Sequence, residues 1–186
     1  YDEGTGEITV AKGPTTPEDP SLGVVNVIDK AGVAMGEVVF FAHGSTIATN
    51  ALVERNLAKT GLLTTKGFRD VLELRRGNRD ELWDFYHDVA PAPVRRRDRL
   101  EVEERIDYTG KVLTPLDIAG VERAAQIFRR KGVEAVAVCF INAYVDGRHE
   151  REARRILEEH LPGVHISLSH EILPEIFEFE RTSTTV

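Results

Sequence analysis

The sequence predicts an α/β fold in which helices cover a sheet of parallel strands. Continuous apolar runs at residues 37–42 and 133–140 have the length and character of strands that are buried on both faces. Amphipathic helical patterns alternate with these runs along the chain. Strands that alternate with helices in this way are typical of a layered α/β fold with parallel strands.

The first part of the chain, residues 1–74, predicts three strand–helix pairs. Asp19 is the predicted N-cap of a helix, and Pro20 takes the first helical position, where proline is common. Gly32 marks the predicted end of this helix. A turn at residues 2–6 leads into the first strand. The expected strands lie at residues 8–12, 37–42 and 61–65, and the expected helices at residues 20–32, 48–54 and 68–74.

The middle part, residues 75–116, predicts an irregular charged segment followed by an inserted β-hairpin. Residues 100–106 alternate apolar and charged side chains, as a half-exposed strand does, and residues 112–113 pair back across a turn. The last part, residues 117–186, predicts a return to alternating helices and strands. Its expected helices lie at residues 117–131, 147–160 and 172–180, and its expected strands at residues 133–140 and 165–169.

The composition is that of a globular protein and argues against several classes of function. The chain has 186 residues, with 24 Lys and Arg against 31 Asp and Glu, and a formal net charge of −7. This acidic balance argues against a nucleic-acid-binding surface, and no apolar run reaches the ~20 residues of a membrane span. Cys139 is the single cysteine, and the six histidines lack metal-ligand spacing. We therefore expect no metal site in this chain and a reducing compartment, the cytoplasm.

The first candidate site follows the strand predicted at residues 37–42. It comprises His43, Gly44, Ser45, Thr46 and Asn50. A glycine at a strand end and hydroxyls at a helix N-terminus create a place for an anion or a carboxylate, because backbone N–H groups there lack partners. The simpler interpretation, which the spacing alone favours, is that one hydroxyl caps the helix and that the histidine ends the strand.

A second set of polar residues stands near residue 180. It comprises Glu180, Arg181, Thr182, Ser183, Thr184 and Thr185. Carboxylate, guanidinium and hydroxyl groups in this order are able to bind a polar substrate or a phosphate, but an ion pair beside a helix end explains the same pattern. Two basic stretches, at residues 75–79 and 95–97, are interpreted as solvated segments that pair with Asp80, Glu81 and Asp98.

Several segments, taken together, resemble the N-terminal region of the hydantoinase A/oxoprolinase family. They occur in the family's order and at its spacing over nearly the whole chain, and the set is specific where each segment alone is not. They lie at residues 14–17, 43–52, 64–73, 134–139, 149–151 and 169–175, the last leading into residues 180–185. The family comprises ATP-dependent N-methylhydantoinases, 5-oxoprolinases and caprolactamase, and related subunits of acetone and acetophenone carboxylases.

The resemblance implies an actin-like fold of the sugar-kinase class for the parent protein, together with a shared chemistry. ATP, with Mg²⁺, phosphorylates a carbonyl or enolate oxygen of the substrate, and water or a carbon nucleophile then attacks. A partner subunit or domain of the hydantoinase B type is also implied. The first candidate set would line the substrate or phosphate cleft, and the second would lie at a domain junction. The resemblance implies no catalytic role for an individual residue.

The resemblance further implies that the chain is part of a longer subunit. Such subunits open with a phosphate-binding hairpin that would precede Tyr1, and their second nucleotide-binding half would follow Thr185. We therefore expect the parent enzyme to hydrolyse a cyclic amide (a hydantoin, 5-oxoproline or a lactam), and this chain alone to be inactive and to bind ATP poorly. The alternative within the family is an ATP-dependent acetone or acetophenone carboxylase. The alternative outside it is a non-catalytic α/β module that binds a partner subunit.

Overall fold

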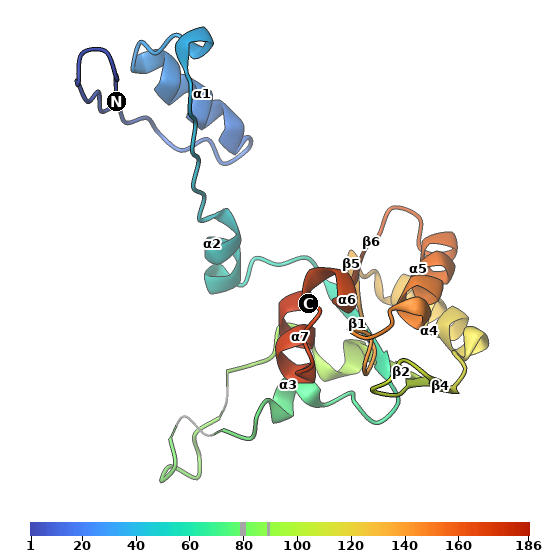
Figure 1. The fold of residues 1–186 in the computed structure, drawn as a ribbon. Coiled ribbons are helices and arrows are strands. Elements are labelled where there is room, and N and C mark those ends of the chain that lie inside the picture. The colour runs from blue at the N-terminus through green and yellow to red at the C-terminus, as the bar shows by residue number, and fades with distance from the viewer. Residues whose placement is uncertain (79–80, 89) are drawn as a thin grey trace. The chain divides into compact units, whose positions relative to one another are not determined.

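The computed structural model describes residues 1–78, 81–88 and 90–186, and the chain divides into two compact units. The first unit is Tyr1–Ile47 and the second is Ala48–Val186. Figure 1 follows the elements of both units along the chain. Every strand found in the described residues belongs to the second unit.

The first unit is built around one helix, α1 (Pro20–Lys30), and a short 3₁₀ helix, η1 (Met35–Glu37). Asp19 caps α1 as predicted, because its Oδ1 accepts hydrogen bonds from Ser21 N (3.0 Å) and Ser21 Oγ (2.5 Å). A second helix, α2 (Ile47–Glu54), begins at the last residue of this unit. It confirms the helix predicted to follow the first candidate site.

The strands predicted at residues 8–12 and 37–42 are not formed, so this part of the prediction is wrong. Val39 and Phe40 are 94% and 84% exposed, although their apolar run suggested burial on both faces. Such a run has a high preference for strand, but a strand exists only when a neighbouring strand pairs with its backbone. Among the described residues, no segment pairs with either run.

The second unit contains a four-stranded sheet in which all neighbouring strands are parallel. Its strands, in order across the sheet, are β2 (Arg99–Val102), β1 (Thr60–Thr65), β5 (Ala135–Cys139) and β6 (His165–Leu168). Leu63 of β1 stands in register with Leu100 on one side and Val138 on the other. The central strands β1 and β5 are almost wholly buried, which confirms the strands predicted at residues 61–65 and 133–140.

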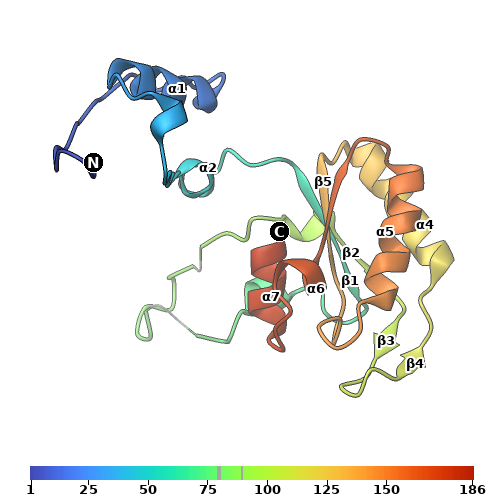
Figure 2. The same cartoon turned by 45° about the horizontal axis from the view of Figure 1, so that its top comes forward.

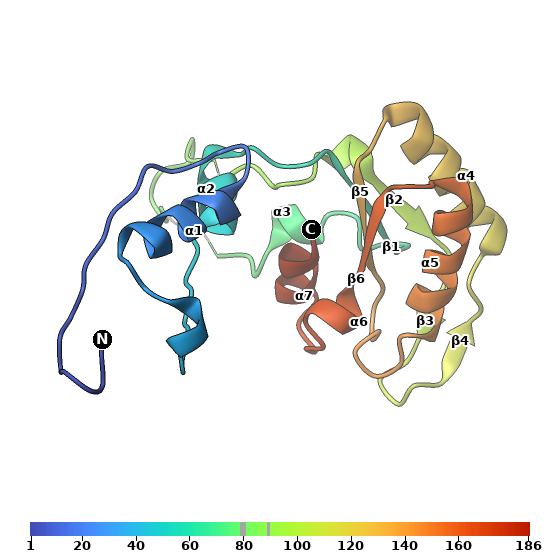
Figure 3. The same cartoon turned by 90° about the horizontal axis from the view of Figure 1, so that it is seen from above.

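Helices cover both faces of this sheet, as Figures 2 and 3 show from two directions. The described α-helices of the second unit, besides α2, are α3 (Val71–Leu74), α4 (Ile118–Lys131), α5 (Arg148–His160), α6 (Ser169–Ile172) and α7 (Glu178–Thr185). A short 3₁₀ helix, η2 (Arg96–Asp98), precedes β2. The long helices α4 and α5 lie on one face, where Phe128 and Leu157 are fully buried in the main apolar core. The short helices lie on the other face, where Leu72 and Cys139 belong to a smaller apolar cluster.

The long helices follow the sequence prediction closely. Asp117 caps α4, because its Oδ1 accepts a hydrogen bond from Gly120 N (2.9 Å). Gly132 ends the same helix with a left-handed backbone (φ 61°), which a residue without a side chain adopts at little cost. The helix predicted over residues 147–160 is α5.

The strand predicted over residues 100–106 is divided between two sheets. Its first residues belong to β2 at the edge of the main sheet. Only β3 (Arg105–Ile106) pairs with β4 (Val112–Thr114) in an antiparallel hairpin. Between β2 and β3 the side chain of Glu104 is buried, and its Oε2 lies 2.8 Å from His149 Nδ1. The inserted hairpin is therefore present but shorter than predicted.

The helix predicted over residues 172–180 is wrong in its bounds, because the chain forms the two helices α6 and α7 instead. Pro174 lies between them, and a proline disfavours helical backbone at the residue before it. Leu173 accordingly has φ −147° and ψ 89°, outside the helical region. This break lets α7 begin at Glu178 and collects residues 180–185 in one helix.

We expect Gly61→Ala to destabilise the protein by about 1–3 kcal/mol, because an added methyl group has no room in this core. A Cβ atom at Gly61 would lie 2.5 Å from Cε1 of Phe128, on the neighbouring helix α4. Gly36→Ala is the matched control, since nothing lies within 4 Å of a Cβ atom there. Urea unfolding followed by circular dichroism measures both changes, and equal stability of the two variants would contradict the packing described for β1.

Candidate functional site

A buried carboxylate lies at the carboxyl end of the central strand β5. Glu150, in the first turn of α5, is completely inaccessible to solvent. Its Oε1 accepts hydrogen bonds from Phe140 N (2.9 Å) and Ser169 Oγ (2.6 Å). Its Oε2 accepts from His170 N (3.1 Å) and lies 2.6 Å from His170 Nδ1. Both oxygens therefore have two partners each, drawn from the end of β5 and from α6.

Arg181 extends this network from helix α7. This residue is 1% exposed, and its Nε donates a hydrogen bond to Ser169 Oγ (3.2 Å). Its Nη2 donates to Phe140 O (3.1 Å) and its Nη1 to Glu175 O (2.5 Å). Glu150 and Arg181 thus share Ser169 and Phe140 as neighbours. The attraction between their opposite charges offsets part of the cost of removing each group from water. The arginine fixes α7 against the end of β5.

The other predicted residues of α7 divide among its faces. Thr182 and Thr185 are buried, and Thr184 is exposed. Glu180 and Ser183 lie on a third face, where they line a pocket. The structure therefore brings two of the six predicted residues together at a concave surface.

Cys139 lies beside the buried threonines of α7, in the core rather than at a surface. Burial raises the pKa of its thiol, which keeps the sulfur protonated at neutral pH. The thiol is therefore a core group that is not activated as a nucleophile.

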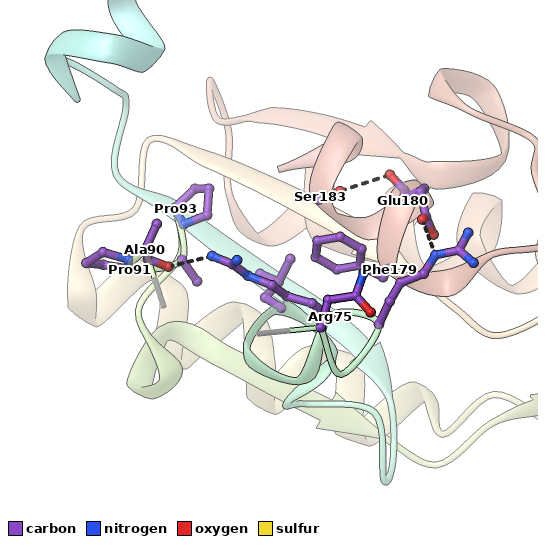
Figure 4. Close-up of a pocket in the computed structure, with 11 residues that line it drawn as sticks. Arg75, Ala90, Pro91, Pro93, Phe179, Glu180 and Ser183 are labelled. Atoms are coloured by element: carbon purple, nitrogen blue, oxygen red, sulfur yellow. Dashed lines mark hydrogen bonds and ion pairs between the residues drawn. The ribbon is translucent and has the colours of Figure 1, made fainter. Parts of the chain in front are cut away.

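The pocket lies between helices α3 and α7 and has a volume of about 480 Å³, which is the size of a small-molecule site. Figure 4 shows the residues that line it. Polar groups come from Arg75, Arg76, Asn78, Glu180 and Ser183, and apolar groups from Leu72, Ala90, Pro91, Ala92, Pro93 and Phe179. A mostly apolar wall with a few convergent polar groups is the usual composition of a ligand site.

An ion pair between Arg76 and Glu180 defines one side of the pocket. Arg76 Nε donates a hydrogen bond to Glu180 Oε1 (2.5 Å), although the two residues are 104 positions apart in the chain. The guanidinium also lies over the ring of Phe177, 4.2 Å from its centroid. The second carboxylate oxygen of Glu180 is buried and has no hydrogen-bond partner among the described residues. The hydrogen bond from Arg76 lowers the pKa of Glu180, so the carboxylate is charged at neutral pH.

Arg75 forms the opposite side of the pocket in an unusual backbone conformation. It has φ 51° and ψ −128°, a combination that costs free energy in any residue with a side chain. Its Nη2 donates a hydrogen bond to Ala90 O (3.0 Å), which Figure 4 shows at the end of the pocket away from Glu180. Strained residues of this kind are held in place by their surroundings and cluster at functional sites.

The first basic stretch departs from the predicted pairing with Asp80 and Glu81. Arg76 pairs with Glu180 in a distant helix. In the second stretch Arg97 does pair with Asp98, at 3.8 Å, as predicted. Arg79, the last residue of the first stretch, and Asp80, one of its expected partners, lie outside the described residues.

The first candidate set occupies exposed positions before and within α2. Ser45 Oγ accepts a hydrogen bond from Ile47 N (3.3 Å), which is the contact of a hydroxyl at the start of a helix. A Cβ atom at Gly44 would meet nothing within 4 Å, so the chain around it does not require a glycine. The proposed role of these residues in a cleft stays a prediction.

Sequence reasoning missed the buried network around Glu150. In the sequence His149 and Glu150 form part of a segment that resembles the family and lack metal-ligand spacing, and neither observation indicates a buried network. The available signal was their position in the first turn of an amphipathic helix, where a glutamate on the apolar face predicts a buried partner. The structure shows both side chains buried.

Comparisons with known proteins place this α/β chain in a family. A family model described as hydantoinase/oxoprolinase N-terminal region matches residues 1–161, so the chain belongs to the hydantoinase/oxoprolinase family. The caprolactamase subunit alpha of Pseudomonas jessenii is 35% identical over 97% of this chain and 27% of its own length. The acetophenone carboxylase gamma subunit of Aromatoleum aromaticum is 33% identical over 97% of this chain and 28% of its own length.

Solved structures agree with this assignment. The crystal structure of ATP-dependent caprolactamase from Pseudomonas jessenii matches the whole chain with a TM-score of 0.83 and 33% identity. The nucleotide-free structure of acetone carboxylase matches 97% of the chain with a TM-score of 0.85 and 24% identity. The chain spans 28% of each of these two proteins. The fold class predicted from the sequence, an α/β part of an actin-like domain, is confirmed.

We expect Glu150→Ala to destabilise the protein by roughly 3–5 kcal/mol, because it leaves Phe140 N, Ser169 Oγ and His170 N without their acceptor beside the buried guanidinium of Arg181. Glu152→Ala, on the exposed face of the same helix, is the matched control and should change stability by less than about 0.5 kcal/mol. Thermal unfolding measures both. A mild effect at residue 150, similar to that at residue 152, would contradict the role of the network.

The ion pair at the pocket predicts a pH dependence. Because the pKa of Glu180 is lower in the folded protein, the pair stabilises the fold above the carboxyl's unfolded pKa and is lost as pH falls through the folded value. Arg76→Ala should raise the pKa of Glu180 toward the ordinary glutamate value, and carbon-detected NMR titration measures this shift. Arg97→Ala is the control, since Arg97 contacts Asp98 instead. An unchanged pKa in the first variant would refute the pairing.

Proposed function

We propose that the protein containing this chain uses ATP to open a cyclic amide, such as a lactam, a hydantoin or 5-oxoproline. The observation that carries the proposal is the similarity of nearly the whole chain to the alpha subunit of caprolactamase, in sequence and in fold. Relatives named 5-oxoprolinase, from Dictyostelium discoideum and Arabidopsis thaliana, support the same substrate class.

The proposed reaction explains why an amide hydrolase would use ATP. Phosphorylation of the carbonyl oxygen makes the ring carbon electrophilic enough for water to add to it. The ring C–N bond of this adduct then breaks with the amine as leaving group, and a second water hydrolyses the resulting acyl phosphate to a carboxylate and phosphate. The phosphoryl transfer depends on positioning and on charge stabilisation. Of these two contributions, positioning is the one proposed for this chain, which would bind and orient the substrate.

ATP and Mg²⁺ are proposed for the whole protein. Within residues 1–78, 81–88 and 90–186, no three His, Cys, Asp or Glu side chains gather to hold a metal ion. The pocket at Glu180 presents a carboxylate, which repels phosphate oxygens. The described residues thus do not by themselves fit a Mg²⁺–nucleotide site, and no step is assigned to such a site in this chain.

A partner subunit or domain of the hydantoinase B type completes the proposal. The relatives named above as alpha and gamma subunits support an enzyme of several subunits. We propose the cytoplasm as the location, because the single cysteine is a free thiol. No helix in the described part of the chain is long and apolar enough to cross a membrane.

The proposal also includes the first candidate set. His43, Gly44, Ser45, Thr46 and Asn50 are proposed to line the substrate or phosphate cleft of the complete subunit. Their exposure at the start of α2 supports a role that the rest of the protein completes.

The second candidate function is that of an ATP-dependent carboxylase subunit acting on a ketone. It rests on the similarity to the acetophenone carboxylase gamma subunit and to acetone carboxylase. A non-catalytic module that only binds a partner subunit is the third. The three functions can be told apart by ATP hydrolysis: a cyclic amide stimulates it in the first, a ketone stimulates it in the second, and no compound stimulates it in the third.

We expect ATP hydrolysis by the full-length protein with its partner subunit to rise at least tenfold on addition of a cyclic amide. The panel is 2-pyrrolidinone, ε-caprolactam, hydantoin and 5-oxoproline with Mg²⁺, and the control is acetone or acetophenone with bicarbonate. Stimulation by a ketone alone would favour the carboxylase. Hydrolysis that no compound stimulates, with no rise in melting temperature on adding Mg²⁺–ATP, would favour the non-catalytic module.

A further inference from the structure

We infer that the pocket between α3 and α7 binds the edge of a cyclic amide, with the amide N–H facing Glu180 and the carbonyl oxygen facing Arg76. This inference rests on the proposed function and adds the place and the geometry of substrate recognition. All residues that line the pocket belong to the second unit of the chain.

The donor half of the site is the guanidinium of Arg76. In the described part of the chain it donates one hydrogen bond, through Nε, and its side chain is 47% exposed. A guanidinium carries five N–H donors in a planar fork, so its outer N–H groups are available to a ligand. The contact with Phe177 fixes the plane of the fork at the pocket wall.

The acceptor half of the site is the carboxylate of Glu180. Oε1 is bound to Arg76, whereas Oε2 is buried without a hydrogen-bond partner. An unpaired buried oxygen is costly, and a ligand that donates a hydrogen bond removes this cost. The side chain lines the pocket and is 33% exposed, and the inference requires the carboxylate to turn about its broad terminal torsion until this oxygen faces the ligand.

A donor next to an acceptor is the complement of one kind of amide. In rings as small as those of the common lactams the amide is held cis, so that N–H and C=O lie on the same side. An open-chain secondary amide or a peptide is trans, and its N–H and C=O point to opposite sides. The pair Arg76–Glu180 therefore matches a cyclic amide and not an extended peptide.

The remaining wall of the pocket fits the rest of such a ring. Leu72, Pro93 and Phe179 supply apolar surface for ring methylene groups, and the volume of about 480 Å³ exceeds that of a five- to seven-membered ring. A phosphate is a poorer match, because the carboxylate of Glu180 stands beside the arginines. The pocket thus recognises the uncharged, reacting part of the substrate.

The test compares ligands and variants in the full-length protein with its partner subunit. Dissociation constants are measured by calorimetry for 2-pyrrolidinone, ε-caprolactam and hydantoin, and for the same compounds with every amide N–H methylated. One charge-assisted hydrogen bond predicts that the N–H form of at least one ring binds about 10- to 100-fold tighter than its methylated form. N-methylacetamide, an open-chain trans amide, should not bind measurably.

Glu180→Ala should abolish the preference for the N–H form, because the acceptor is gone. Glu178→Ala is the matched control: it lies in the same helix, is exposed and should keep the full preference. The ratio is taken within each variant, so a fraction of unfolded protein changes both constants equally and leaves the ratio intact. Melting temperatures of both variants accompany the measurement.

A full N–H preference in Glu180→Ala would overturn the assignment of this pocket, even if the wild-type protein opens the ring with ATP. Absence of an N–H preference in the wild-type protein would also overturn it. Failure of the proposed function is distinct, since ATP hydrolysis would then respond to none of the cyclic amides.

Discussion

The second unit depends on a carboxylate that is buried at the end of its central strand. Glu150 receives hydrogen bonds from the backbone that follows β5 and from the first two residues of α6. A buried carboxylate is tolerated only when its lone pairs are satisfied, so these segments have one permitted arrangement. Arg181 then joins the network through Ser169 and carries helix α7 with it.

The position of α7 in turn determines the pocket. Once Arg181 is fixed on the inner face of the helix, Glu180 must point to the side, where α3 ends and Arg76 reaches it. The pair joins residues that are 104 positions apart, and it lines the same pocket as Leu72 and Ala92 of the smaller apolar cluster. The buried network around Glu150 and Arg181 therefore determines where Glu180 and Arg76 lie in the pocket, which is open to solvent.

The sequence predicts correctly those helices whose caps and apolar pattern lie within the helix itself or at its ends. Asp117 and Gly132 mark the ends of α4, and the apolar pattern between them repeats at helical spacing. The run at residues 37–42 carries the same kind of signal as the one at residues 133–140, yet only the second forms a strand. An apolar run shows that residues favour burial, but pairing depends on a partner elsewhere in the chain.

The candidate site was accessible to sequence reasoning only in part. Glu180 and Ser183 stood out as polar residues, and the resemblance to the family assigned them to a junction. The partnership of Arg76 with Glu180, and the burial of Arg181 beside it, follow from tertiary packing. Charge alone left Arg76 in a basic stretch with nearer acidic neighbours, because no local pattern specifies a contact across 104 residues.

The most direct measurement is a crystal structure of the full-length protein with its preferred cyclic amide bound. The account predicts the ring between α3 and α7, with its N–H within hydrogen-bond distance of Glu180 and its carbonyl oxygen on Arg76. A ring bound elsewhere, with the pocket filled by side chains of the same protein, would contradict the account.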